Sequence, residues 1–132
     1  RQTEHVMSPL RTPLFDWHVA HQGRMVEFGG WEMPVQYTGI VAEHHAVRRD
    51  VGLFDISHMG RLLVQGIGAR SYVDGLVTCR VDNLRPGQIR YGLMCRDDGG
   101  ILDDVLVYAN DQSPGEPEAI GLVVNAGNRD KL

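Results

Sequence analysis

Two adjacent carboxylates, Asp103 and Asp104, lie in the middle of an apolar run and are the first candidates for chemistry. The apolar residues around them, over 101–107, predict a strand. Because successive side chains of a strand point to opposite faces of a sheet, one aspartate must lie toward a partly apolar interior. An ionised carboxylate there costs several kcal/mol unless it is paired or hydrogen-bonded. A hydrophobic pattern broken in this way indicates a functional site.

The pattern does not decide which aspartate is the functional one. Alternation puts Asp103 on the face of Val105 and Val107. Asp104 then shares the other face with Leu106. A purely structural role is the alternative, with one carboxylate in solvent and the other bound by nearby backbone N–H groups. From the pattern alone both interpretations stay open.

The six histidines raise the question of a metal site. His18 and His21 are three residues apart on a predicted helix, with Asp16 just before them. A site needs a third ligand, and no HExxH motif or cysteine pair supplies one. Adjacent His44 and His45 point about 100° apart on a helix and cannot bind one ion together. We therefore expect capping, solvated or hydrogen-bonded core histidines, and no metal.

Other catalytic motifs find little support. The pairs Gly29-Gly30 and Gly99-Gly100 are turn glycines without the spacing of a phosphate-binding loop. No Ser or Cys stands in the context of a nucleophile elbow. Ser57-His58 is a bare dipeptide, and sequence neighbours rarely reach the geometry of a nucleophile and its base.

The composition is that of an ordinary globular chain. The chain is 42% hydrophobic and 23% charged, with a net charge of −4. Its length of 132 residues is enough for one sizeable hydrophobic core. The basic residues do not cluster, so we expect no nucleic-acid partner. No apolar stretch approaches the ~20 residues of a membrane span, so we expect no membrane association. Cys79 and Cys95 are isolated, as in a reduced chain without a disulfide framework.

Apolar periodicity and turn residues predict the elements that position these groups. The predicted helices are 12–20, capped by Thr12, then 38–50 and 69–77. The predicted strands are 25–28, 53–56, 61–65, 88–95, 101–108 and 119–125, and 34–37 is a loop. The inward faces of the second and third helices are Ile40, Val41, Val47 and Val51, and Tyr72, Val73, Leu76 and Val77. This order predicts an α+β fold, mostly antiparallel sheet with flanking helices.

Several longer stretches resemble one family, the aminomethyltransferase (T-protein) of the glycine cleavage system. They are Thr12–His18, Phe28–Tyr37, Glu43–Arg48, Leu53–Met59, Gly99–Val107 and Val124–Ala126. They occur in the family's order from about Ser8 to the last residue, which is far more specific than one short motif. The resemblance implies the first part of a three-domain folate-binding fold. Residues 1–7 are then a disordered or non-native extension, and 8–132 a truncated N-terminal part of the folate-binding domain.

The same resemblance implies a function and a site. The family takes the aminomethyl group from the lipoylated H-protein, releases ammonia and forms 5,10-methylenetetrahydrofolate from tetrahydrofolate. Its catalytic aspartate is the second of the pair, which corresponds to Asp104. Met59, Tyr91 and Asn125 correspond to residues that line the folate pocket, together with Asp104. Without the resemblance, Tyr91 would be an ordinary cross-strand aromatic residue and Met59 a core residue.

Two other functions are compatible with this resemblance. One is the folate-binding domain of a dimethylglycine or sarcosine dehydrogenase, which a start near Met7 disfavours. The other is a non-catalytic folate-binding scaffold, which the intact Asp103-Asp104 pair disfavours. For an aminomethyltransferase we expect a bacterial cytoplasmic location, or the mitochondrial matrix in a eukaryote. We expect the truncated chain alone to be inactive.

Overall fold

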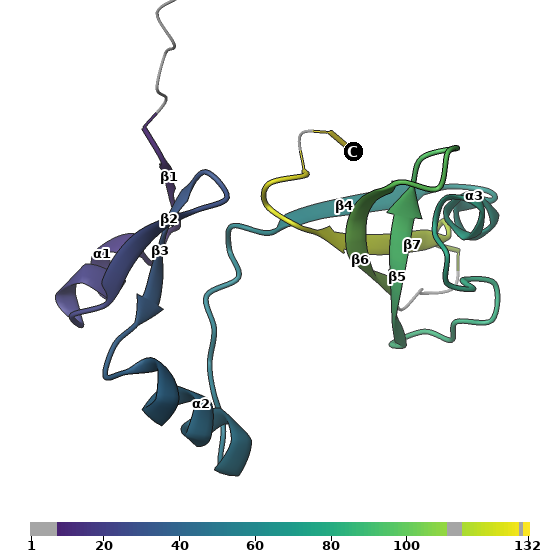
Figure 1. The fold of residues 1–132 in the computed structure, drawn as a ribbon. Helices are drawn as coiled ribbons and strands as arrows, with labels where there is room; N and C mark the ends of the chain where they lie inside the picture. The colour runs from purple at the N-terminus through teal and green to yellow at the C-terminus, as the bar shows by residue number, and fades with distance from the viewer. Residues whose placement is uncertain (1–7, 111–114, 130) are drawn as a thin grey trace, which may run out of the picture. The chain divides into compact units, whose positions relative to one another are not determined.

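The chain forms two compact units, residues 1–58 (unit 1) and 59–132 (unit 2). The computed structural model describes residues 8–110, 115–129 and 131–132. The extension expected at residues 1–7 lies outside the described residues. Each unit combines sheet and helix, with mostly antiparallel strand pairs, as Figure 1 shows. The expected α+β fold class is confirmed.

Unit 1 contains a small sheet and two helices. Its elements are β1 (Leu10–Arg11), α1 (Phe15–Ala20), β2 (Arg24–Phe28), β3 (Trp31–Gln36) and α2 (Ile40–Arg49), and the strand order is β1-β3-β2. Strands β2 and β3 form a hairpin, and β1 pairs with β3 in parallel. The hairpin turn has positive φ at both Gly29 and Gly30, as a two-residue hairpin turn requires.

Two strand predictions in unit 1 are wrong. Residues 34–36 were expected in a loop and belong to β3. Since β1 pairs only with Trp31 and Glu32, Pro34 lies where β3 has a single neighbour, which is where a sheet tolerates proline. The apolar run 53–56 forms no strand, because no described strand pairs with it. Its residues Leu53 and Phe54 are exposed.

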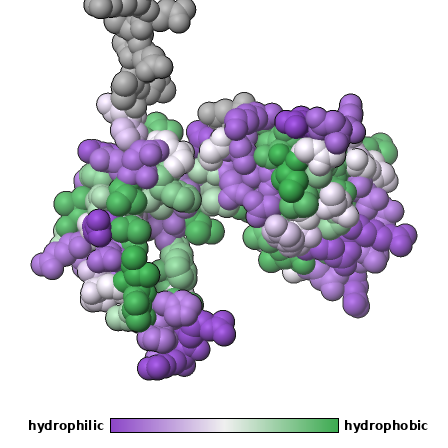
Figure 2. Space-filling view, in the orientation of Figure 1, coloured by the Kyte–Doolittle hydropathy of each residue, from purple (hydrophilic) through white to green (hydrophobic). Residues whose placement is uncertain are grey.

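The two helices of unit 1 differ from prediction in detail. Helix α1 begins at Phe15 rather than Thr12, because Pro13 and Leu14 form a turn in which the Phe15 N–H bonds to the Thr12 carbonyl. Helix α2 lies inside the predicted range 38–50. Its expected inward stripe is exposed, and no residue of α2 is buried. Figure 2 shows hydrophobic surface on this unit, as these exposed residues require.

Unit 2 is a four-stranded antiparallel sheet with a helix on one face. Its elements are β4 (Gly60–Gln65), α3 (Ala69–Leu76), β5 (Ile89–Cys95), β6 (Ile101–Ala109) and β7 (Ala119–Val124), in the strand order β4-β7-β6-β5. The buried core lies between the sheet and α3 with the segment that follows it. It consists of Val73, Val77, Val81, Leu84, Val105, Val107, Ala109, Ile120, Leu122 and Val124. These elements match the predicted ones within one or two residues.

The inward face of α3 is narrower than predicted. Val73 is fully buried and Val77, directly after the helix, is buried as well. Tyr72 and Leu76, also expected inside, are exposed. A short helix on a sheet buries one stripe at i and i+4 spacing, so the neighbouring positions stay in solvent.

Two glycines of unit 2 give a matched test of this packing. A Cβ at Gly92 on β5 would lie 2.7 Å from the Cys79 Sγ, whereas a Cβ at Gly75 on α3 would meet nothing within 4 Å. We expect Gly92→Ala to lower the free energy of unfolding by about 1–3 kcal/mol through overpacking. Gly75→Ala should raise it by about 0.5 kcal/mol through helix propensity. Urea denaturation of both variants measures this, and equal stabilities would contradict the packing.

Candidate functional site

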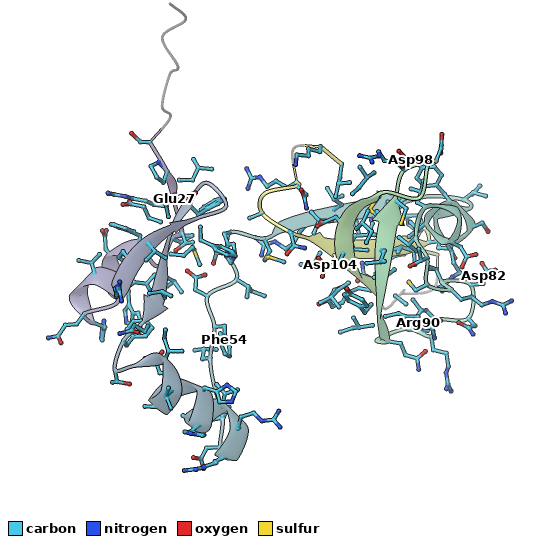
Figure 3. All side chains as sticks on the ribbon, in the orientation of Figure 1. Glu27, Phe54, Asp82, Arg90, Asp98 and Asp104 are labelled. Carbon is cyan, nitrogen blue, oxygen red and sulfur yellow. The ribbon has the colours of Figure 1, made fainter. Side chains whose placement is uncertain are left out.

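Strand β6 separates the two aspartates onto opposite faces of its sheet. Asp103 lies on the core side with Val105 and Val107 and is 3% exposed. Asp104 lies on the side away from α3 together with Leu106, and both are exposed (Figure 3). The sequence prediction that one aspartate faces the interior is therefore confirmed, and the buried one is Asp103.

Asp103 is bound by three N–H donors from the turn that follows β7. Its Oδ2 accepts the backbone N–H of Asn125 at 2.8 Å. Its Oδ1 accepts the side-chain Nδ2 groups of Asn125 at 2.9 Å and of Asn128 at 2.7 Å. Burial alone would raise the pKa of Asp103, but these hydrogen bonds outweigh it and hold the pKa below its ordinary value. Asp103 is therefore a buried, ionised carboxylate whose two oxygens both accept hydrogen bonds.

Asp104 is linked to the same turn by one side chain. The Nδ2 of Asn125 donates to the Asp104 Oδ1 at 2.7 Å and to its backbone carbonyl at 3.1 Å. The Asn125 carboxamide thus connects the buried carboxylate to the exposed one. It orients Asp104 on a face that no described helix of unit 2 covers.

The strand register distributes the four predicted site residues across the width of the sheet, from Met59 before the edge strand β4 to Tyr91 on the opposite edge strand β5. Gly60 pairs with Val124, so Met59 and Asn125 follow that pair at the same end of the sheet. Leu106 pairs with Val123, which puts Asp104 beside Asn125. Tyr91 on β5 is opposite Leu106, two residues from Asp104 along the face.

The face of the sheet that carries Asp104 bears several exposed apolar side chains. Tyr91 is 60% exposed, and Leu63, Ile89 and Leu106 of the same face are exposed as well. Figure 2 shows hydrophobic residues at the surface over the β5–β6 part of unit 2. A carboxylate among aromatic and aliphatic groups can bind the N–H edge of a flat heterocycle while its ring packs on the apolar side chains.

Sequence reasoning missed Asn128 and left open which of the two aspartates has the structural role. Asn128 belongs to the turn after β7, in which the N–H groups of Asn128 and Arg129 both bond to the Asn125 carbonyl. Asparagine is frequent in turns because its side chain bonds to nearby backbone. A second asparagine three residues after Asn125, directly after a buried strand, was the sequence signal that could have indicated this turn.

Unit 1 holds a second buried polar cluster, around His18. Its Nε2 lies 2.8 Å from the Asp55 Oδ2 and its Nδ1 lies 2.6 Å from the Tyr37 hydroxyl. The Asp55 and His18 side chains are both 3% exposed. Burial would raise the pKa of Asp55, but hydrogen bonds from Ser57 and His18 hold it well below its ordinary value. Since an ionised Asp55 only accepts, Nε2 carries the proton of that bond.

Two histidines of this unit, His18 and His21, make contacts that stabilise its structure. His18 is the hydrogen-bonded core histidine that the sequence allowed, and His21 stacks on Trp17 with ring centroids 3.9 Å apart. Among the residues that the structure describes, no three His, Cys, Asp or Glu side chains gather as a metal would need. Cys79 and Cys95 are both free thiols. No described helix has the length and apolarity to cross a membrane.

Comparison with known proteins gives consistent matches over nearly all of this chain. The model of the GCVT N-terminal domain family matches residues 14–132. Aminomethyltransferases of Desulforamulus reducens and Halothermothrix orenii are 52% and 50% identical over 121 residues, which is 92% of this chain and 32% of each relative. The crystal structure of the glycine cleavage system aminomethyltransferase T from Bartonella henselae is 33% identical. It superposes with a TM-score of 0.82 over 92% of this chain and 32% of that one.

The chain thus spans about a third of the length of the relatives that it matches.

The buried carboxylate gives a test of stability against pH. We expect Asp103→Asn to lower the free energy of unfolding at pH 7 by about 1.5–3 kcal/mol, because hydrogen bonds to a charged acceptor are lost. Because the folded pKa of Asp103 is depressed, its contribution is full above the unfolded value near 4 and is lost as pH falls through the folded value. The stability difference between wild type and variant should therefore shrink below about pH 4. Denaturation between pH 2.5 and 7 measures it, and a difference that is constant with pH would contradict an ionised Asp103.

Proposed function

Because this chain belongs to the GCVT N-terminal domain family, we propose that it works within a tetrahydrofolate-dependent aminomethyltransferase of the glycine cleavage system. The substrate in this proposal is the aminomethyl group on the dihydrolipoyl arm of the H-protein, which is the protein partner. Ammonia leaves, the dihydrolipoyl thiol is released, and the one-carbon unit passes to tetrahydrofolate as 5,10-methylenetetrahydrofolate. The activity belongs to a protein of the relatives' full length, of which this chain supplies part of the folate site.

The observation that carries this proposal is the position of Asp104. Its carboxylate is exposed on the open face of the unit 2 sheet, held by Asn125 and flanked by exposed apolar side chains. Exposure lets a ligand reach the carboxylate, and the hydrogen bond limits its orientation before the ligand arrives. Both properties are what a positioned acid–base group needs.

The residues present fit tetrahydrofolate in chemical type. The edge of its pterin ring carries N–H donors, for which the Asp104 carboxylate is an acceptor. Asn125 offers its Oδ1 as an acceptor, because its Nδ2 already donates to Asp103 and Asp104. Tyr91 offers an aromatic ring for packing, and Met59 a flexible apolar side chain. When bound, tetrahydrofolate supplies the nitrogen that takes the one-carbon unit.

Asp104 acts in this proposal by hydrogen bonding and proton transfer. Its carboxylate accepts a hydrogen bond from the region of the reactive nitrogen, which orients that nitrogen toward the carbon that it attacks. It then holds the proton that leaves the nitrogen. A positioned acid–base group of this kind typically contributes ~10²–10⁴-fold to the rate.

The two alternative functions differ from this proposal in an observable way. A folate domain of an amine dehydrogenase would take its one-carbon unit without an H-protein, and a scaffold would bind folate without turnover. The relatives at 52% and 50% identity bear the name aminomethyltransferase, which favours the transferase. Ammonia release that depends on aminomethyl-loaded H-protein distinguishes the transferase from the other two.

The first prediction of this proposal concerns Asp104 in the full-length protein. We expect Asp104→Asn to lower the rate of methylenetetrahydrofolate formation by ~10²–10⁴-fold, because the acid–base group is lost. The thermal unfolding midpoint should stay within a few degrees, since Asp104 is exposed. Asp82→Asn, an exposed aspartate on the segment between α3 and β5, is the matched control and should keep the full rate. Near-normal turnover in Asp104→Asn would refute the assignment.

The second prediction concerns the aromatic ring of Tyr91. Tyr91→Ala should weaken tetrahydrofolate binding by about tenfold, since aromatic stacking contributes about 0.5–1.5 kcal/mol beyond the buried area. Tyr91→Phe keeps the ring and should bind nearly as wild type. Calorimetry on the full-length protein measures both, with Tyr72→Ala on α3 as an exposed tyrosine control. Equal affinity of the Ala variant would remove Tyr91 from the site.

A further inference from the structure

We propose that Asp103 and Asn128 are positioning residues that fix the Asp104 carboxylate through the Asn125 carboxamide. Asp103 is buried on the core side of the sheet, and Asn128 lies half-buried in the turn after β7. Each acts on Asp104 through a chain of hydrogen bonds that begins in the core side of the sheet. This inference rests on the proposed function, since it assigns roles around Asp104.

The first step is the orientation of Asn125. Its Nδ2 faces three acceptors, the Oδ1 atoms of Asp103 and Asp104 and the carbonyl of Asp104. An amide oxygen in that place would meet only acceptors and would be repelled, so the environment selects one of the two amide orientations. The acceptor Oδ1 of Asn125 therefore points away from both aspartates.

The second step is what keeps Asn125 in place. Asp103 holds it twice, because the two carboxylate oxygens accept its backbone N–H and its side-chain Nδ2. A two-point contact of this kind fixes both the main chain and the side-chain torsions of Asn125. It is strong because the acceptor is charged and buried.

The third step assigns Asn128. Its Nδ2 binds the same Asp103 Oδ1 that accepts Asn125, at 2.7 Å, and its backbone N–H bonds to the Asn125 carbonyl at 3.0 Å. Asn128 therefore closes the turn and gives the Asp103 Oδ1 a second hydrogen-bond donor. Without the Asn128 side chain, the Asp103 carboxylate loses one of three donors from the turn and holds Asn125, and through it Asp104, less tightly.

The consequence falls on Asp104. An exposed aspartate ordinarily samples several rotamers, and every rotamer other than the productive one lowers the rate. The 2.7 Å bond from Asn125 selects one of them before a ligand binds. Removing Asn128 should thus affect the rate of transfer more than the affinity for tetrahydrofolate.

The kinetic test uses the full-length protein and the variant Asn128→Ala. We expect kcat to fall about tenfold, which equals ~1.4 kcal/mol, while KM for tetrahydrofolate changes less than about threefold. Asn128→Ser keeps a short hydroxyl donor and should restore part of the rate. Asn83→Ala, an exposed asparagine outside this network that accepts from Arg90, is the control and should leave kcat unchanged.

A double-mutant cycle tests the route through Asp104. If Asn128 acts only through Asp104, Asn128→Ala causes no further loss in the Asp104→Asn background under single-turnover conditions. An unchanged kcat in Asn128→Ala, or an equal loss in both backgrounds, would overturn the proposal. Wild-type turnover in Asp104→Asn would instead overturn the proposed function itself.

A measurement that does not depend on catalysis distinguishes a failure of this positioning proposal from a failure of the proposed function. In protein labelled with ¹⁵N-asparagine, the side-chain amide of Asn125 should show slow hydrogen exchange, which Asn128→Ala accelerates at least about fivefold and Asn83→Ala does not. Asp103→Asn should shift the same resonances. Unchanged Asn125 signals in a folded Asn128→Ala variant, with the fold checked by thermal unfolding, would show that Asn128 does not hold Asn125 and would overturn the proposal whatever the activity.

Discussion

The burial of one negative charge organises unit 2. Side chains of a strand alternate between faces, so a pair of adjacent aspartates sends one of them into the core of any sheet that has one. Asp103 takes that position and needs donors, because an unpaired buried carboxylate would cost several kcal/mol. The turn 125–129 supplies them, and in doing so it brings the Asn125 amide to Asp104. The structural carboxylate thus assembles the surroundings of the exposed one.

Unit 1 relies on polar contacts to a greater degree. Met33 is the one buried hydrophobic residue among its described residues, whereas His18, Thr12 and His58 are buried polar ones. The bonds of His18 to Tyr37 and Asp55 tie the segment after α2 to the residues around α1 and β3. A further carboxylate, Glu43, accepts the backbone N–H groups of residues 37–39 before α2. Directional contacts of this kind define a conformation even where little apolar area is buried.

Local pattern predicted unit 2 well because its helix, hairpin and strands bury their own apolar residues. The alternation around Asp103 and Asp104 was visible, and the family resemblance named Asp104, but neither showed the turn that joins them. A hydrogen bond between residues far apart in the sequence, such as Asn128 and Asp103, produces no periodic pattern from which it could be predicted. The wrong assignments of element type lie in unit 1, where the apolar run 53–56 was interpreted as a strand. A short apolar run is typical of a buried strand, but it does not show that another strand lies beside it to pair with.

The β6–β7 pairing also separates the two site residues from the connection between these strands. Strand β6 ends at Ala109 and β7 begins at Ala119, and both positions lie at the end of the pair opposite Asp104 and Asn125. Ladder pairs from Ala109–Ile120 to Leu106–Val123 lie between them. Insertions in the connection can therefore change its length while the two site residues stay opposite each other. Deletion of one residue between Asp104 and Leu106 would instead exchange the faces of the two aspartates. The Asp104 carboxylate would then point into the core.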